Sequence, residues 1–196
     1  MIVLLRHGRT EANASGLLLG RADPVLDAEG RRQAEAAAAS LGPVDLVVSS
    51  PLARTRETAD FFDAPVEVDD RWIELDYGQW DERPVADVTR EEWIAWRSDV
   101  EFAPPDGESL GALGRRVREA MGDLAVRAAH DTVVVTTHVS PIKAAVAHVL
   151  DAGDEATWNL FVAQASLSRV RVAPSRGVTA GFVLEQFNDV SHYAAP

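Results

Sequence analysis

Two histidines and two arginines stand where short apolar runs of the chain end. Arg6 and His7 follow the apolar run at the amino terminus, and His138 follows a run of three valines and two threonines. Arg54 belongs to the first turn of a helix predicted after another apolar run. Ligands of open α/β sheets bind outside the carboxyl ends of the strands. If these strands are neighbours, the four side chains meet at one end of the sheet.

A cluster of two imidazoles and two guanidinium groups suits phosphoryl transfer. A neutral imidazole is a competent nucleophile toward phosphorus, and guanidinium groups hold phosphate oxygens with paired hydrogen bonds. A second histidine can donate to the equatorial oxygens as charge develops. His7 and His138 would hold a metal ion only with a carboxylate as third ligand, and the arginines beside them would repel a cation. The cluster therefore favours phosphate over a metal.

The alcohol that leaves a phosphate ester needs a proton, so a carboxyl group should lie near this cluster. Glu74, in the segment of residues 73–78, is our candidate for the proton donor. Asp76, Glu82 and Glu108 are nearby acids that could serve instead, and the sequence leaves that choice open.

The elements that must position these residues alternate between strands and helices. Apolar runs predict strands at residues 2–5, 45–48, 66–68, 133–135, 166–172 and 181–187, the last two as a hairpin. Helices are predicted at residues 29–41, 50–62, 91–97, 108–129 and 140–150, and a loop at 8–27. Ser50 and Ser140 are the predicted N-caps of their helices, each followed by proline. The alternation favours an α/β fold, a three-layer α/β/α sandwich whose mostly parallel central sheet has an antiparallel edge strand.

Composition limits the partners of the chain. It has 196 residues, a formal net charge of −12 and no cysteine. The negative charge argues against binding to nucleic acid or to an anionic membrane, because both require a basic surface. The lack of cysteine excludes disulfides, thiolate metal sites and cysteine nucleophiles. No segment has the pattern of a signal peptide or a membrane helix, so we expect a cytoplasmic protein.

Motifs along nearly the whole chain resemble, in order and spacing, those of the histidine phosphatase superfamily, the phosphoglycerate-mutase-like proteins. The first is Arg6-His7-Gly8-Arg9-Thr10-Glu11-Ala12-Asn13, which is similar to RHGxTxxN. The others are Gly20 to Ala34 (GRxDxPLTxxGxxQA), Ser49 to Thr55 (the start of SSPLxRxxxTA), Glu74 to Asp81 (ExxxGxWE), Gly107-Glu108-Ser109 (GES) and Thr137-His138 with the second histidine.

The resemblance implies a role for each matching residue. His7 would be the nucleophile that accepts the phosphoryl group. Glu74 would donate a proton to the leaving group and then activate water. No metal or organic cofactor would be needed for hydrolysis. The phosphoryl group would be bound by Arg6, Arg54 and His138, with help from Asn13.

The resemblance also implies one histidine phosphatase domain over residues 1–196, with a cap-like insertion around 72–110. Such a domain would be a phosphoric monoester hydrolase acting on a small phosphorylated metabolite, as a monomer or homodimer. A mutase-type phosphotransferase is the first alternative, although true mutases of the family are longer, and a non-catalytic phosphate-binding module is the second. Further candidates for substrate contacts are Thr10, Arg21 and Val139, with Arg9 and Lys143 farther along the substrate.

Two positions depart from the family pattern. Val139 follows the second histidine where glycine is usual, and Asp81 follows the tryptophan where glutamate is usual. The backbone N–H of Val139 remains available to a phosphate, with a tighter approach. The variant at His138, together with residues 188–192, resembles acid phosphatase domains, some fused to ribonuclease H and some similar to α-ribazole phosphatases. α-Ribazole phosphate and sugar phosphates are therefore the substrates to consider first.

Overall fold

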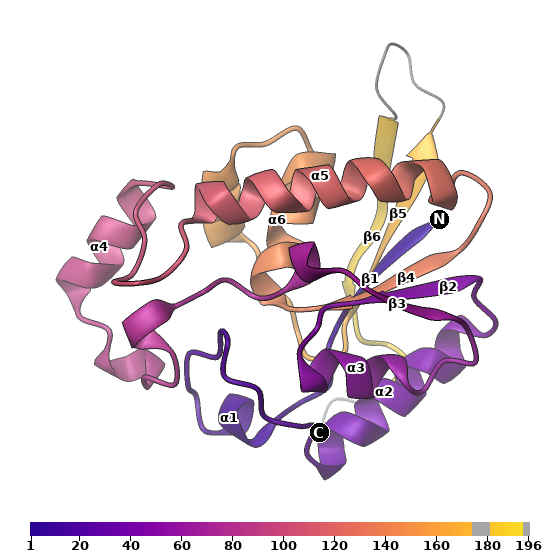
Figure 1. The fold of residues 1–196 in the computed structure, drawn as a ribbon, viewed down its shortest axis with the longest axis horizontal. Coiled ribbons are helices and arrows are strands. Elements are labelled where there is room, and N and C mark those ends of the chain that lie inside the picture. The colour runs from indigo at the N-terminus through magenta and orange to yellow at the C-terminus, as the bar shows by residue number, and fades with distance from the viewer. Residues whose placement is uncertain (174–180, 194–196) are drawn as a thin grey trace.

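One six-stranded sheet runs through the centre of the molecule (Figure 1), in a computed structural model that describes residues 1–173 and 181–193. The strands are β1 (Ile2–Arg6), β2 (Leu46–Ser49), β3 (Val66–Val68), β4 (Val133–Thr137), β5 (Leu167–Ala173) and β6 (Gly181–Asp189). Their order across the sheet is β3-β2-β4-β1-β5-β6. The first four are parallel, whereas β5 pairs antiparallel with β1 and β6 pairs antiparallel with β5. The predicted fold is confirmed, with two antiparallel strands at the edge where one was predicted.

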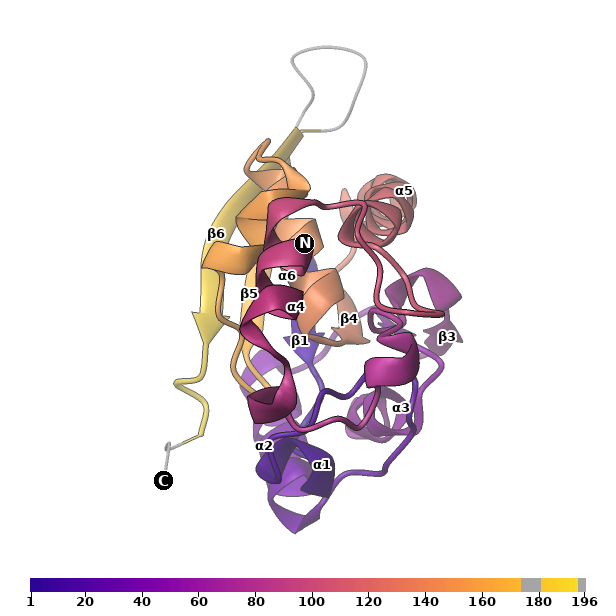
Figure 2. The ribbon, with the colours of Figure 1, turned by 90° about the vertical axis from the view of Figure 1, so that its left-hand side faces the viewer.

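Helices cover both faces of the sheet and give the three layers that the sequence predicts (Figures 1 and 2). They are α1 (Glu11–Ala14), α2 (Ala28–Leu41), α3 (Ala53–Ala59), α4 (Arg90–Ser98), α5 (Leu110–Ala128) and α6 (Val139–Val149). α2 and α3 lie on one face, and α5 and α6 lie on the other. Within the described part of the chain, no helix combines the length and the apolar character needed to cross a membrane.

The central strands are buried on both faces because successive side chains point to opposite sides of a sheet. In β1, Ile2 and Leu4 belong to the core formed with α5 and α6, which includes Val117. Val3 and Leu5 belong to the second core, formed with α2 and α3. This two-sided burial holds β1 and β4 rigidly, and both strands end at the candidate catalytic histidines.

The segment between β3 and α5 lies beyond the carboxyl ends of the parallel strands, to the left of the sheet in Figure 1. It contains α4 and three short 3-10 helices. Three of its aromatic side chains, with Trp158 from a later part of the chain, pack around Trp96, which is only 3% exposed. The cap-like insertion that we predict around residues 72–110 includes most of this segment. The partners of Trp96, at centroid distances of 5.0–5.7 Å, are Tyr77, Trp80, Trp93 and Trp158.

The predicted starts of two helices are wrong. α3 begins at Ala53 with Leu52 as its N-cap residue, and it ends at Ala59. Ser50 lies outside that helix, and its hydroxyl binds a histidine instead of capping backbone N–H groups. α6 begins at Val139 with His138 at the N-cap position, so Ser140 is already inside the helix. In both places a serine before a proline has the pattern of a cap. The Ser50 hydroxyl binds His138 instead, and α6 begins directly after His138, before Ser140.

The predicted loop at residues 8–27 contains one turn of helix, α1, that the sequence analysis missed. Thr10 is its N-cap and forms a capping box with Asn13, in which each side chain binds the backbone N–H of the other. Four residues with no buried side chain give no apolar periodicity, so only the Thr10–Asn13 spacing could have revealed the helix.

Candidate active site

The rings of His7 and His138 lie against each other, with centroids 5.2 Å apart and planes inclined by 62°. The strands before them, β1 and β4, are neighbouring parallel strands in which Arg6 is opposite Thr137. The backbone N–H of His7 donates to the carbonyl of Thr137 at 2.9 Å. Two histidines more than a hundred residues apart in sequence are therefore brought together by one register of the sheet.

His7 is held as a neutral ring with one free nitrogen. Its Nδ1 lies 2.7 Å from the carbonyl oxygen of Gly8. A carbonyl only accepts, so Nδ1 carries the proton and Nε2 keeps its lone pair. Burial, followed by the charges of Arg54 and Arg6, holds the pKa of His7 well below 6.5. The ring is neutral at pH 7, which is the form that attacks phosphorus.

His138 has both ring nitrogens engaged. Arg54 Nε donates to His138 Nδ1 at 3.2 Å, so Nδ1 is the acceptor and Nε2 carries the proton. His138 Nε2 donates to the hydroxyl of Ser50 at 2.7 Å. Burial lowers the pKa of His138 well below 6.5, and the charges of Arg54 and Arg6 lower it further.

The two arginines are buried, and Arg54 directs its Nε–H at His138. The Arg54 side chain is fully buried and donates to the carbonyls of Ala22 and Gly20 at 2.7 and 2.8 Å. Arg6 donates to the carbonyl of Val162 at 2.7 Å, and its buried Nε has no hydrogen-bond partner in the described structure. Burial lowers the pKa of Arg6 to about 10, so the group remains charged at neutral pH.

Glu74 reaches the same place from the segment after β3. Its carboxylate is almost fully buried and accepts from the backbone N–H groups of Leu75 at 2.7 Å, Val139 at 3.1 Å and Ser140 at 3.2 Å. It therefore covers the first turn of α6, where unpaired N–H groups favour an anion. The Val139 N–H that the sequence analysis assigns to a phosphate is bound by Glu74 here.

The alternative proton donors are held by other partners. Asp76 lies 3.7 Å from Arg21 and accepts from the backbone of Gly78. Glu108 forms a two-bond ion pair with Arg116 and lies 3.6 Å from Arg21. Glu82 has a positive φ of 61° and contributes only its backbone to the described hydrogen bonds nearby. Glu74 is the carboxylate with direct contact to the start of α6.

Thr10, Asn13 and Arg21 contact other groups than the histidines. Asn13 and Thr10 bind each other through the capping box of α1, and Thr10 is fully buried. Arg21 is held near Asp76 and Glu108. No hydrogen bond given by the described residues joins these three side chains to His7 or His138.

Three supporting groups were missed as such from the sequence. Ser50 was predicted as a helix cap and binds His138 instead. Asp81 was noted only as a departure from the family pattern, yet its carboxylate accepts from three consecutive backbone N–H groups at residues 20–22. The backbone of Val162 holds Arg6, and a backbone carbonyl leaves no signal in a sequence.

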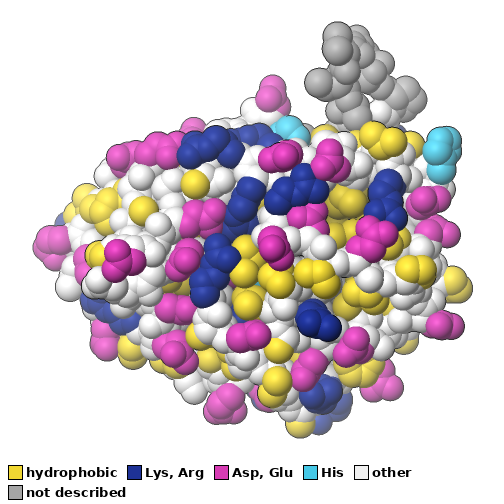
Figure 3. Space-filling view, viewed as in Figure 1, with side chains coloured by type: hydrophobic (Ala, Val, Ile, Leu, Met, Phe, Trp, Pro, Cys, Tyr) yellow, Lys and Arg dark blue, Asp and Glu magenta, His cyan; other side chains and the backbone are white. Residues whose placement is uncertain are grey.

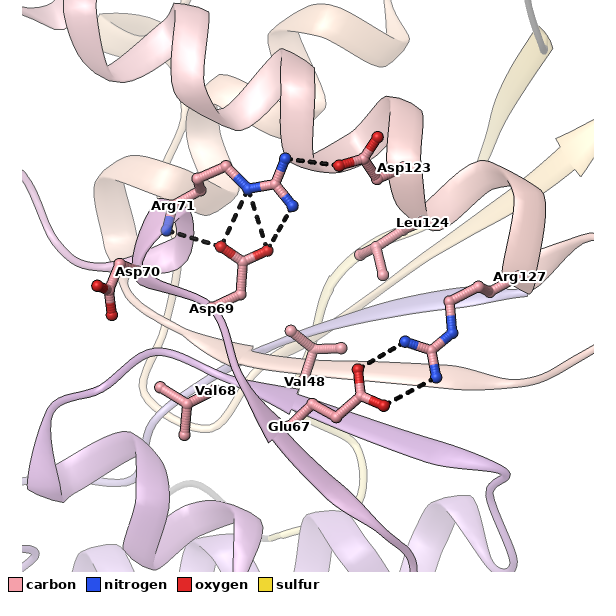
Figure 4. A pocket seen from close by; sticks show the side chains of 9 residues that line it. All are labelled: Val48, Glu67, Val68, Asp69, Asp70, Arg71, Asp123, Leu124 and Arg127. Atoms are coloured by element: carbon pink, nitrogen blue, oxygen red, sulfur yellow. Dashed lines mark hydrogen bonds and ion pairs between the residues drawn. The ribbon is translucent and has the colours of Figure 1, made fainter.

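Other parts of the described surface offer weaker candidates. A cavity of about 360 Å³ lies between β3 and α5, and both of its arginines are already paired, Arg71 with Asp69 and Asp123, and Arg127 with Glu67 (Figure 4). Basic and acidic side chains are interspersed over the face in Figure 3, which shows no continuous basic area. No group of three or more His, Asp or Glu side chains in the described ranges is arranged to hold a metal ion.

The whole described architecture matches known sequences and structures. A sequence profile of the family called Histidine phosphatase superfamily (branch 1) matches residues 2–185. The Mycobacterium tuberculosis protein named Bifunctional protein Rv2228c is 37% identical over 177 residues, which is 85% of this chain and 49% of that protein. The chain thus spans about half the length of that relative.

Two further similarities extend over full lengths. The Yersinia enterocolitica protein named "Probable phosphoglycerate mutase GpmB" is 31% identical over 206 aligned positions, covering 100% of this chain and 95% of its own length. The structure of mycobacterial glucosyl-3-phosphoglycerate phosphatase Rv2419c in complex with VO3 aligns with a TM-score of 0.85 and 29% identity. That alignment covers 95% of this chain and 98% of the other.

Proposed function

Because the chain belongs to the histidine phosphatase superfamily, we propose that it hydrolyses phosphate monoesters through a phosphohistidine on His7. One observation carries this proposal. A buried, neutral His7 presents its free Nε2 beside two buried arginines and a second histidine. A neutral nucleophile among fixed positive charges is suited to a dianionic phosphate, because the charges stabilise the phosphoryl group without protonating the nucleophile.

The reaction begins with attack of His7 Nε2 on phosphorus. The P–N bond forms while the bond from phosphorus to the ester oxygen breaks, and Glu74 in its acid form gives its proton to that oxygen. The phosphoryl oxygens are held by Arg6 and Arg54, and His138 adds a further bond when its Nε2–H turns from the Ser50 hydroxyl to a phosphoryl oxygen. The positive arginines offset the negative charge that spreads over these oxygens in the transition state.

Water then completes the cycle. Glu74, now a carboxylate, accepts a proton from water, and the resulting hydroxide attacks phosphorus as the bond to His7 Nε2 breaks. Inorganic phosphate leaves, with Glu74 again in its acid form and His7 again neutral. No metal or organic cofactor takes part in these steps.

The substrate-binding set extends around this centre. A bound phosphate would take the Val139 N–H that Glu74 now holds, since both are anions at the same helix start. Asn13, Thr10 and Arg21 remain proposed substrate contacts. A phosphoglycerate derivative, as in the names of two relatives, joins α-ribazole phosphate and sugar phosphates among the candidate substrates.

The test uses His7→Ala beside the control His130→Ala, which removes an exposed histidine. We expect the parent and the control to release p-nitrophenol from p-nitrophenyl phosphate and His7→Ala to lose at least about 1,000-fold in kcat/KM. Stopping the parent reaction in alkali should leave labelled phosphate on the protein, since phosphohistidine survives base. Equal rates for His7→Ala and the parent would refute the proposal.

The relative named as a mutase gives a specific reason to test phosphotransfer as well. Phosphorus NMR with 3-phosphoglycerate separates the two activities. Growth of an inorganic phosphate signal supports hydrolysis. Growth of 2-phosphoglycerate without inorganic phosphate would replace the hydrolase by a phosphotransferase with the same nucleophile, and binding without either product would indicate a phosphate-binding module.

A further inference from the structure

Lys143 is a partly buried residue in the second turn of α6. It follows Val139 by four residues, so the two side chains lie on one face of the helix. Helical side chains lean toward the amino-terminal end of their helix, and the Lys143 side chain is therefore directed toward the turn that holds Glu74. Within the described structure its pKa is shifted only by burial and by charges at longer range, with no hydrogen bond or ion pair.

The charges around Lys143 do not neutralise it. Burial lowers the pKa of Lys143, the charge of Glu74 raises it, and the charges of Arg6 and Arg97 lower it. The oxygens of Glu74 are occupied by backbone N–H groups. Arg97, by contrast, is exposed and lies over the ring of Trp158 at 5.5 Å. A partly desolvated ammonium without a carboxylate partner is costly unless an anion binds there.

The position of Lys143 relative to Glu74 tells which part of a substrate it would meet. Glu74 gives its proton to the leaving oxygen in the mechanism above, so it marks the leaving-group side of the phosphorus. Lys143 lies about one turn after Val139, whose backbone N–H binds Glu74. Two further cations, Arg21 and Arg116, already have Asp76 or Glu108 as partners.

We propose that Lys143 binds a second anionic group, a carboxylate or a second phosphate, on the leaving-group part of the substrate. This inference rests on the proposed function for the side on which the leaving group lies. It narrows the substrate class to phosphomonoesters whose alcohol carries a negative charge of its own. A charge-assisted bond to such a group gives about 10- to 100-fold in affinity.

The experiment measures binding by titration calorimetry on the His7→Asn background, in which turnover is absent. The ligands are 3-phosphoglycerate and glycerol 1-phosphate, which differ by a carboxylate in place of a hydroxymethyl group. We expect His7→Asn to bind 3-phosphoglycerate more tightly than glycerol 1-phosphate. Adding Lys143→Met should lower the affinity for 3-phosphoglycerate about 10- to 100-fold and change the affinity for glycerol 1-phosphate by less than about 2-fold. Arg127→Gln, which removes a distant positive charge in the last turn of α5, is the matched control and should change neither.

Equal weakening of both ligands by Lys143→Met would overturn the proposal, because a residue acting only through Glu74 or through the fold does not discriminate them. Equal affinities before the substitution would overturn it too. Because the readout is binding, selectivity lost with Lys143 would support the inference even if the parent hydrolysed no ester. In that case only the proposed function would fail.

A second, independent observation concerns Asp81. Its carboxylate accepts from the backbone N–H groups of Gly20 at 2.7 Å, Arg21 at 2.8 Å and Ala22 at 2.7 Å. The carbonyls of Gly20 and Ala22 in turn accept from the two terminal nitrogens of Arg54. One carboxylate thus fixes the three-residue loop that holds the buried guanidinium.

We infer that Asp81 is a positioning residue that sets the orientation of Arg54 through residues 20–22. The test is a double-mutant cycle on kcat/KM with Asp81→Asn and Arg54→Lys. If Asp81 acts through Arg54, Asp81→Asn alone lowers kcat/KM about 10-fold or more and has less than about 2-fold effect once Arg54 is lysine. Asp81→Glu, which keeps the carboxylate, should recover part of the loss. Independent, multiplicative effects of the two substitutions would overturn the inference, since a general loss of stability would act on both backgrounds alike.

Discussion

The buried, neutral state of His7 makes the stability of the fold depend on pH in a direction that the structure sets. Burial and the charges of Arg54 and Arg6 hold the folded-state pKa of His7 well below 6.5. An unfolded histidine has a pKa of about 6.5 and takes up a proton as the pH falls below that value. The folded protein does not take up this proton, so acid favours the unfolded state. His7 therefore destabilises the fold progressively below about pH 6.5 and has no such effect above it.

The size of the effect follows from one proton. Each proton taken up only by the unfolded state lowers the free energy of unfolding by about 1.4 kcal/mol per pH unit. Between pH 7.5 and pH 5.5, His7 alone should cost about 1.4 kcal/mol, because the unfolded histidine becomes about nine-tenths protonated over that range. Substituting His7→Asn removes this contribution. The contributions of His138 and of the acids remain in both proteins and cancel in the comparison.

Urea unfolding of the parent and of His7→Asn at pH 7.5, 6.5 and 5.5 measures the difference directly. Phosphate buffers must be avoided, because an anion that binds the folded site would add its own stabilisation. The free energy of unfolding of the parent should fall by about 1.4 kcal/mol more than that of His7→Asn over this range. His130→Asn, at an exposed position, should follow the parent. Parallel curves for the parent and His7→Asn would show that the folded protein protonates His7 readily, and the neutral nucleophile would have to be abandoned.

Three further substitutions test other parts of the site. Gly8→Ala should destabilise the protein by about 2 kcal/mol or more in thermal unfolding, because a Cβ would lie 2.2 Å from the carbonyl oxygen of Gly30, whereas the control Gly122→Ala meets no atom within 4 Å and should be neutral or stabilising. Ser50→Ala should cost about 1–3 kcal/mol, since it leaves the buried N–H of His138 unpaired; unchanged urea unfolding would count against that bond. Glu74→Gln should slow phenyl phosphate about 100-fold or more, but p-nitrophenyl phosphate far less; equal slowing would remove Glu74 as proton donor.

The juxtaposition of the two histidines was within reach of sequence reasoning because the signal is strong at the strands that carry them. β1 begins with four aliphatic residues and β4 with three, and both strands are buried along their whole length. Each run ends directly in the residues that carry the chemistry. The alternation of such runs with helices predicts a parallel sheet, and a parallel sheet places these strand ends on one side.

The residues that support those histidines could not be predicted from the sequence, for a physical reason. Serine before proline satisfies the local rule for a helix start at both Ser50 and Ser140. Nothing in the local sequence shows that a distant imidazole binds the Ser50 hydroxyl, or that a distant carboxylate binds the backbone N–H of Ser140. The role of Asp81 depends on a loop sixty residues earlier in the chain, which only the tertiary structure brings near. The predictable residues are therefore those that follow buried parallel strands, whereas Ser50 and Asp81 act through individual side-chain contacts that leave no pattern in the sequence.

The two serines that were wrongly predicted as N-caps, Ser50 and Ser140, lie at the strand ends that form the site. Where a strand ends at a site residue, the first N–H groups of the following helix bind groups of the site. In α6, for example, Val139 and Ser140 donate to Glu74. A helix capped at Ser140 would begin later, with the serine hydroxyl bound to the N–H of residue 142 or 143, and the N–H groups of Val139 and Ser140 would not form part of its first turn. Some cap motifs stand at the carboxyl end of a buried parallel strand and yet do not cap the helix. Such an unused motif indicates that a functional group lies at the start of that helix. By that reasoning the Ser140 hydroxyl, which contacts the side chain of Tyr77 and does not cap α6, is not what starts the helix. Ser140→Ala should therefore leave the helix content almost unchanged, and a large loss of helix would contradict this reasoning.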